Sequence, residues 1–403
     1  MRIPIAILIG LMLAAPLAAQ TRPRGRELGI PFPGKTGPNN AITDVAGIAV
    51  GHVTLIEGEG KLVPGRGPIR TGVTAILPRP KGNWDPVFAA TFNLNGNGDM
   101  TGINWIKESG FMEGPILLTG THSVGTVRDA AIQWQLKNGR KFVFTYPIVA
   151  ETFDFLNDAN GEHVKPMHAL QALDNAKPGR VQEGAVGGGT GMGCNGFKGG
   201  IGTSSRVLEA GGYTIGVLVQ CNYGGDLRIL GVPIRQEITD LRACTTLPQP
   251  LTREWTRGMP ACPSDRGATD TPEAQQYEGR GSIIVIVATD APLLPHQLER
   301  LTRRVGMALG RLGSWAGNSS GDLFLAFSTA NPGAGSSEGT PSLKMLPNDQ
   351  IDPLFRATID ATEEAVVNAM LAADTMTGAD GIRLFGLPGD RVIAALKKYN
   401  RMK

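Results

Sequence analysis

The sequence predicts an α/β protein in which layers of β-sheet and α-helix pack on one another. Short apolar runs typical of buried strands occur in both halves of the chain, and amphipathic helical segments lie between them. Mixed strands and helices favour packed layers over an all-β sandwich. The 55 glycines follow no collagen period, and charged residues make up only 19% of the chain. This composition indicates a compact, tightly turned enzyme.

The N-terminus has the pattern of a secretory signal peptide. Arg2 precedes an apolar run from Ile3 to Leu17, and the small residues Ala18 and Ala19 follow. The run is short for a membrane span. We therefore expect residues 1–19 to be removed, and residues 20–403 to form one soluble domain, periplasmic or secreted, without a membrane segment. The net charge of +3 is scattered along the chain, so no nucleic-acid surface is expected.

The first half should contain most of the strands. Residues 20–40, rich in Pro, Gly and Arg, indicate an extended arm. Apolar runs between Gly-rich turns predict strands at Gly72–Leu77, Val87–Phe92, Pro115–Thr119, Lys141–Val149 and Tyr213–Val219. The spacing of Val124, Val127, Ala131 and Trp134 predicts a helix over Val124–Leu136.

The second half begins with a change of character. Residues 235–281 are polar and Pro-rich, as in a linker or a functional loop. The β-branched run Ser282–Ala288 then predicts a strand buried on both faces. An apolar stripe from Leu298 to Leu312 predicts a helix. A strand at Leu323–Phe327 and a helix at Pro353–Ala373 complete the pattern.

Neither the cysteines nor the histidines have the spacing of a metal site. No Cys-x-x-Cys and no His-Glu-x-x-His occurs, so no metal and no cofactor is expected. Cys244 and Cys262 lie in one polar stretch and can form a disulfide after export. Cys194 and Cys221 lie in Gly-rich or apolar surroundings and are expected to be small core residues.

Gly281 and Ser282 form the junction between the polar segment and the most apolar strand. Self-cleavage by an N→O acyl shift needs this arrangement, because glycine permits an unusual backbone and the strand fixes the hydroxyl. Cleavage would leave Ser282 with a free α-amine, whose reference pKa is about 7.7–8.0, able to act as a local base. The alternative is an ordinary serine between a loop and a strand.

Ser320 and Asp322 stand two residues apart at the start of the next strand. Period-two geometry directs both side chains to one face, where a hydroxyl and a carboxylate can relay a proton. The alternative is a solvated turn. Gly317–Gly321 also matches Gly-x-Ser-x-Gly, but a helix precedes it and a strand follows. A nucleophile elbow has the reverse order, so we reject that interpretation.

Two further polar residues follow apolar strands. Asn222 follows Ile215–Val219, and its amide can donate to an oxyanion or merely form a turn before glycine. Glu151 follows another strand and can bind a substrate ammonium group or be exposed. Gly187–Gly200 contains a formal Gly-x-Gly-x-x-Gly. Further glycines follow where a dinucleotide site requires a helix, so tight turns or a close backbone approach are expected there.

Taken together, these segments resemble the L-aminopeptidase/D-amidase-esterase family, which includes the β-peptidyl aminopeptidases. Similar stretches occur in the same order over nearly the whole mature chain. They are Asn40–Gly47, Val50–His52, Asn95–Gly98, Thr119–Thr121, Val149–Thr152, Val186–Gly200, Gly202–Arg206, Gln220–Gly224, Gly281–Leu293 and Gly317–Phe327. The resemblance implies a four-layer α-β-β-α sandwich. It also implies self-cleavage into subunits 20–281 and 282–403, and assembly into a homotetramer.

The resemblance also implies a role for each candidate residue in hydrolysing peptides, amino-acid amides or esters. Ser282 matches the family nucleophile, and Ser320 and Asp322 match its supporting serine and acid. Asn222 matches the oxyanion donor, and Glu151 the carboxylate that meets the substrate's amino group. Phe153 departs from the pattern, since some members look to carry tyrosine there, so the substrate preference among L-, D- and β-aminoacyl groups stays open.

Three alternatives to this function remain at this point. A superfamily acyltransferase of the ornithine acetyltransferase type would favour a threonine nucleophile and the cytoplasm. A non-catalytic exported binding protein would keep the sandwich and stay uncut. A metal-dependent aminopeptidase is disfavoured by the histidine pattern.

Overall fold

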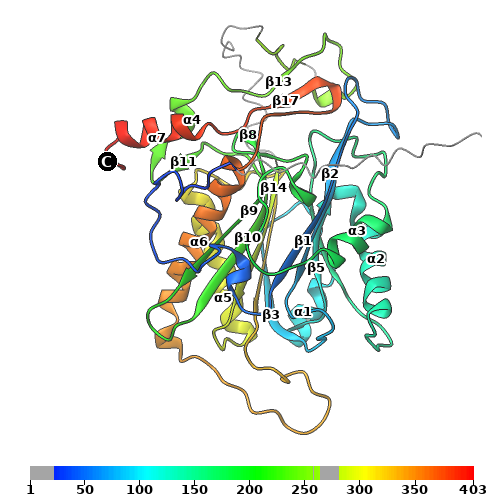
Figure 1. Ribbon diagram of the computed structural model, residues 1–403, viewed down its shortest axis with the longest axis vertical. Helices are drawn as coiled ribbons and strands as arrows, with labels where there is room; N and C mark the ends of the chain where they lie inside the picture. Colours follow the sequence, from blue (N-terminus) through cyan, green and yellow to red (C-terminus); the bar gives the residue numbers. More distant parts are fainter. Residues whose placement is uncertain (1–21, 257, 264–280) are drawn as a thin grey trace, which may run out of the picture.

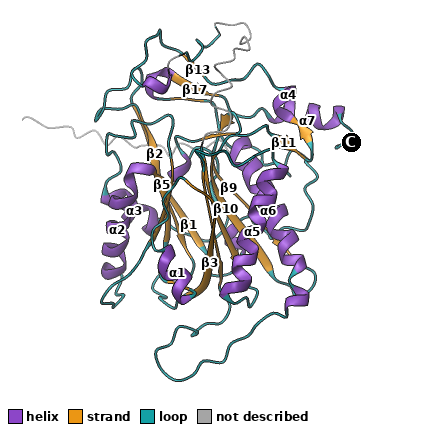
Figure 2. Cartoon of the chain, turned by 180° about the vertical axis from the view of Figure 1, so that it is seen from behind, coloured by secondary structure: helices purple, strands orange, loops and turns teal. Residues whose placement is uncertain are grey.

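Two β-sheets lie face to face with helices on both outer sides, in a computed structural model that describes residues 22–256, 258–263 and 281–403 (Figures 1 and 2). One sheet has the order β1-β2-β5-β6, and the other has the order β4-β3-β15-β14-β10-β9. The first contains β1 (Ala49–Glu57), β2 (Ile69–Leu77), β5 (Ile116–Gly120) and β6 (Ile148–Thr152). The second contains β3 (Val87–Gly96), β4 (Phe111–Met112), β9 (Gly200–Val207), β10 (Thr214–Asn222), β14 (Ser282–Thr289) and β15 (Gly321–Ser328).

The helices cover the two outer faces. α2 (Val124–Lys137) and α3 (Pro166–Asp174) pack on the four-stranded sheet, and α5 (Pro295–Arg311) and α6 (Asp352–Leu371) pack on the six-stranded sheet. Three apolar cores result, one between the sheets and one under each helix layer. The predicted layered fold is confirmed, and it is the four-layer sandwich that the family resemblance implied. Among the described residues, no helix is both long and apolar enough to cross a bilayer.

Strand β14 shows how the sequence builds these layers. Because successive side chains of a strand point to opposite faces, Ile283 and Val285 pack under the helices α5 and α6. Ile284 and Ile286 pack between the two sheets. The central strand is therefore apolar at every position from Ile283 to Ala288, and its position in the molecule is strongly fixed.

Most predicted elements are confirmed, and one predicted strand is largely wrong. Residues 141–147 of the predicted strand Lys141–Val149 are irregular, and Val143 is 98% exposed. Several elements were not predicted, among them the strands β1 and β9 and the helix α3. The glycines of β9 had indicated tight turns or a close backbone approach. In β9 a side chain at Gly202 would collide with the carbonyl of Ala365, so glycine here permits α6 to approach the sheet closely. The predicted signal peptide and residues 264–280 lie outside the described residues.

The described part of 235–281 is more ordered than a linker. It contains α4 (Ile234–Glu237) and β13 (Cys244–Thr245), and β13 joins a small sheet with β17 (Ile382–Leu384) and β16 (Met376–Thr377). The predicted disulfide between Cys244 and Cys262 is present. Remaining short elements are α1 (Ile103–Ser109), α7 (Gly389–Lys398), β7 (Gly193–Cys194), β8 (Phe197–Lys198), β11 (Arg228–Ile229) and β12 (Val232–Pro233).

The prediction for Cys194 and Cys221 was half wrong. Both are buried as expected, but they form a disulfide with Cα atoms 5.7 Å apart. The hairpin β7–β8 folds over the end of β10, which brings together two cysteines 27 residues apart. Sequence spacing alone contained no sign of this fold-back.

Candidate active site

Ser282 is the first residue of β14 and lies at the end of the six-stranded sheet where β10 ends and β15 begins. In the sheet it stands opposite Gly321 of β15 on one side and Asn222 of β10 on the other. The Gly321 N–H donates a hydrogen bond to Ser282 Oγ at 3.2 Å. The hydroxyl is therefore buried, fixed by a rigid strand, and flanked on both sides by hydrogen-bonding groups.

Gly281 has a backbone that only glycine adopts readily. Its φ is +135°, and a side chain there would collide with the carbonyl of Asn222. The Gly321 N–H also lies 3.3 Å from the carbonyl oxygen of Gly281. One backbone donor thus faces both the hydroxyl of Ser282 and the carbonyl of the preceding peptide bond.

Ser320 and Asp322 are side by side, as their spacing predicted. Ser320 Oγ donates to Asp322 Oδ1 at 2.7 Å, and Asn95 Nδ2 lies 3.3 Å from Asp322 Oδ2. Burial raises the pKa of Asp322, against the hydrogen bonds from Ser320 and Asn95, which lower it. A raised pKa makes a carboxylate a stronger base, which suits it to accept a proton from a neighbouring hydroxyl.

Asn222 is held at both ends of its amide. Its Oδ1 accepts from the Gly193 N–H at 2.9 Å, and its Nδ2 donates to the carbonyl of Phe153 at 2.8 Å. An amide NH₂ has two hydrogens, so one remains to donate to an oxyanion. These contacts also show that the orientation of Asn222 depends on the hairpin β7–β8.

Lys198, on that hairpin, was not identified from the sequence. Its side chain is completely buried, and Nζ donates to the carbonyls of Met192 and Gly199 at 2.8 and 2.7 Å, and lies 3.4 Å from that of Gly189. Burial lowers the pKa of Lys198 to about 7. The only signal in the sequence was a single lysine inside a glycine-rich, otherwise apolar segment.

Glu151 lies on the other side of Ser282, next to the chain that leaves β3. Its Oε1 accepts from the Asp99 N–H at 2.9 Å, and Thr121 Oγ1 donates to Oε2. A Cβ built on Gly98 would lie 3.3 Å from Glu151 Oε1 and 3.4 Å from the Gly321 Cα. Gly98 thus lies close to both the Glu151 carboxyl and Gly321, the residue opposite Ser282. Burial raises the pKa of Glu151.

Phe153 contributes to the site mainly through its backbone. Its carbonyl accepts from Asn222, while its ring meets that of Phe155 edge to face with centroids 5.4 Å apart. Next to it, Asp154 is a buried acid that the sequence did not single out. Burial raises the pKa of Asp154 to about 7. Within the described ranges, no group of three or more His, Cys, Asp or Glu side chains is arranged to bind a metal ion.

Comparison with known proteins identifies the family. The model of peptidase family S58 matches residues 40–384. The chain belongs to this family. It is 50% identical to β-peptidyl aminopeptidase BapA of Sphingosinicella microcystinivorans, over 98% of this chain and 97% of that protein. It is 44% identical to BapA of Sphingosinicella xenopeptidilytica, over 97% and 94%.

Solved structures of similar proteins support this family assignment. The L-aminopeptidase D-Ala-esterase/amidase of Ochrobactrum anthropi, a serine aminopeptidase with a variant of the Ntn hydrolase fold, is 42% identical with a TM-score of 0.82, covering 95% of this chain and 100% of that one. A β-aminopeptidase of Burkholderia sp. is 43% identical with a TM-score of 0.78, covering 93% and 98%. The S58 chain is therefore a serine N-terminal-nucleophile peptidase with aminopeptidase or amidase activity. This excludes the acyltransferase and the binding protein as alternatives.

Proposed function

We propose that Ser282 is the nucleophile, and that it is released by self-cleavage of the Gly281–Ser282 peptide bond. The observation that carries this proposal is the shared position of the hydroxyl and of the preceding carbonyl, both facing the Gly321 N–H. Ser282 Oγ attacks the Gly281 carbonyl carbon, and the Gly321 N–H stabilises the negative charge that develops on its oxygen. The hydroxyl proton is transferred to the nitrogen of Ser282, so that collapse breaks the C–N bond and leaves a free α-amine and an ester. Water hydrolyses the ester to the Gly281 carboxylate and the Ser282 hydroxyl.

The same groups then act on a substrate. Ser282 Oγ attacks the carbonyl carbon and forms a tetrahedral oxyanion, to which Asn222 Nδ2 donates. The new α-amine of Ser282 and the Ser320–Asp322 pair take the hydroxyl proton and return it to the leaving amine. Water then releases the acyl group. Glu151, in its ionised form, binds the substrate's amino group, which restricts the reaction to N-terminal residues.

The substrates we propose are peptides and amides with an N-terminal β-amino acid. Two relatives at 50% and 44% identity bear the name β-peptidyl aminopeptidase, and they support this choice. We further propose export through the signal peptide 1–19 to the periplasm, subunits 20–281 and 282–403, and assembly into a homotetramer.

A panel of amides tests this function. β-Alanine amide, L-alanine amide and D-alanine amide are incubated with the wild type and with Ser282→Ala, and released ammonia is measured. We expect hydrolysis by the wild type, with the largest kcat/KM for the β-amino acid, and none by Ser282→Ala. Equal hydrolysis by the two proteins would disprove the role of Ser282, and the highest kcat/KM for an α-amino acid amide would disprove the substrate class.

A further inference from the structure

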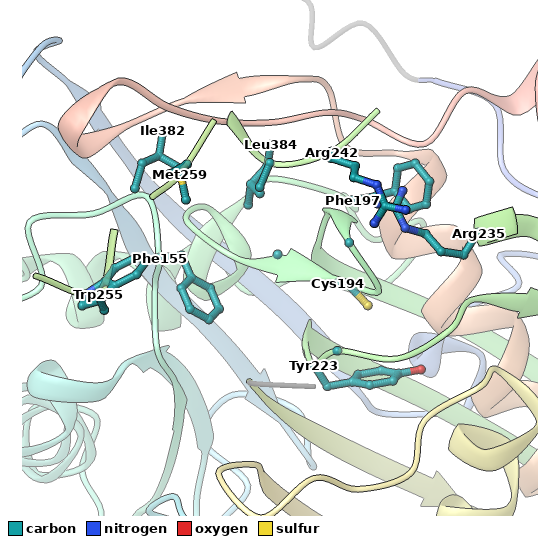
Figure 3. A pocket seen from close by; sticks show the side chains of 14 residues that line it. Phe155, Cys194, Phe197, Tyr223, Arg235, Arg242, Trp255, Met259, Ile382 and Leu384 are labelled. Carbon is teal, nitrogen blue, oxygen red and sulfur yellow. The ribbon is translucent and has the colours of Figure 1, made fainter. Parts of the chain in front are cut away.

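An apolar pocket lies next to Asn222, outside the groups that perform the proposed reaction. Figure 3 shows Phe155 and Trp255 on one side of it, with Met259, Ile382 and Leu384 near each other above them. Cys194 and Tyr223 lie across from these residues. Most of its lining is aliphatic or aromatic, so it is suited to an apolar group of a ligand.

The pocket borders residues on the oxyanion side of the site. Its lining includes Gly193, whose N–H holds Asn222, and Tyr223, the residue that follows Asn222. A row of rings also joins the two places: Phe153 meets Phe155, and Phe155 meets Trp255 edge to face at 6.0 Å between centroids. The part of a substrate that extends from the reacting carbonyl past Asn222 would therefore point toward the pocket.

The pocket and Glu151 lie on opposite sides of Ser282. Glu151 accepts from the Asp99 N–H and lies close to Gly98, in the chain that leaves β3, whereas the pocket lies beyond the end of β10. The strand order β3-β15-β14-β10 places β14, which Ser282 opens, between them. A substrate whose amine meets Glu151 and whose carbonyl meets Ser282 thus extends its leaving group toward β10.

We propose that this pocket binds the side chain of the first residue of the leaving group, and that it favours a large apolar or aromatic side chain. This inference rests on the proposed function, because that function fixes the direction of the substrate. The wall of the pocket is held by tertiary structure. Trp255 and Met259 both lie in the loop closed by the Cys244–Cys262 disulfide, and Leu384 belongs to β17, which pairs with Cys244.

Two substrates with the same acyl group test the pocket. β-Alanyl-L-phenylalanine amide presents a bulky leaving group, and β-alanine amide releases only ammonia. Trp255→Ala and, separately, Leu384→Ala should lower the ratio of kcat/KM for the first to that for the second by about ten-fold or more, as for other losses of apolar contact in a specificity pocket. Trp105→Ala, which changes a partly exposed tryptophan on α1, should leave this ratio unchanged. An unchanged ratio in both pocket variants would overturn the proposal.

A substrate with a different acyl group tests whether the pocket binds the leaving group or the acyl group. β-Homophenylalanine amide carries its aromatic ring on the acyl side. If Trp255→Ala lowers kcat/KM for this amide, relative to β-alanine amide, as much as it lowers the leaving-group ratio, the pocket does not belong to the leaving group and the proposal is wrong.

A binding measurement separates this inference from the proposed function. L-Phenylalaninol, an analogue of the released product that has no amide bond to hydrolyse, is titrated calorimetrically into the wild type and into Trp255→Ala. The wild-type background is used because Ser282→Ala is expected to stay uncut at the site. We expect the Kd to rise about ten-fold or more in Trp255→Ala. Such binding in a protein whose wild type hydrolyses neither amide would retain the pocket and reject the proposed function. Equal Kd values beside normal wild-type hydrolysis would reject the pocket alone.

Discussion

The two sides of Ser282 are built in different ways. On the β15 side, the supporting groups Ser320, Gly321 and Asp322 are three consecutive residues at the start of one strand, and they contact Ser282 or each other directly. On the β10 side, Asn222 is held by residues from separate segments, namely Gly193 and Phe153. One side therefore follows from local geometry, and the other depends on tertiary structure that fixes a single amide.

The largest effect should come from removing that amide. Asn222→Ala deletes the proposed oxyanion donor, and loss of one such donor typically lowers kcat about 10²–10³-fold. Steady-state kinetics on β-alanine amide measure this, with Asn104→Ala, a change at an exposed asparagine on α1, as the control. A loss smaller than about five-fold would show that the β10 side contributes little to catalysis. It would contradict the view that this side of Ser282 depends on a single amide.

A smaller effect should come from the support behind Asn222. Lys198→Met removes the side-chain donor from the buried carbonyl of Gly199, while the carbonyl of Met192 keeps the hydrogen bond from the Gly199 N–H. An unsatisfied buried group costs about 1–3 kcal/mol. The hairpin should shift, so we expect kcat to fall about ten-fold with little change in KM. The exposed Lys177→Met is the matched control.

A double variant shows whether Lys198 acts through Asn222. If it does, adding Lys198→Met to Asn222→Ala should lower kcat no further, because residues acting as one unit are non-additive. Two independent, multiplying losses would mean that Lys198 serves the fold alone.

A third effect should be on stability rather than on turnover, and it should depend on pH. Burial holds the pKa of Asp154 near 7, above that of the unfolded chain near 4. Between these two pH values the folded state binds more protons at Asp154 than the unfolded state does. The contribution of this carboxyl to the free energy of unfolding is therefore greatest at low pH and is lost as pH rises through about 7. At about 1.4 kcal/mol per pKa unit, this carboxyl costs the wild type a few kcal/mol by pH 8.

Asp154→Asn removes this titration while keeping the shape of the side chain. Urea unfolding at pH 5 and at pH 8 should show the free energy of unfolding of the variant rising relative to the wild type as pH increases. Asp129→Asn, at an exposed aspartate of α2, should show no such trend. A difference between Asp154→Asn and wild type that is independent of pH would contradict the raised pKa.

The contrast between the two sides also explains what the sequence could predict. The apolar run after Ser282 and the two-residue spacing of Ser320 and Asp322 are local patterns, and the structure contains both the strand and the hydrogen-bonded pair. Local periodicity in the same way predicted the helices α5 and α6.

Features in which chain segments far apart in sequence pack against one another were not predicted. The Cys194–Cys221 disulfide and the buried Lys198 depend on the hairpin β7–β8, and the close packing of β9 depends on α6. The glycines there are determined by close packing rather than by turns, and composition cannot separate the two. The aromatic pocket likewise joins Phe155 to Trp255, 100 residues apart in sequence.

The state of the chain at Ser282 tests the central claim most directly. The intact masses of purified wild type and Ser282→Ala are compared, with N-terminal sequencing of the smaller wild-type fragment. We predict two wild-type fragments, the smaller beginning Ser282-Ile283-Ile284, and one uncut chain for the variant. A wild-type protein that hydrolyses β-alanine amide as a single unbroken polypeptide would contradict the claim.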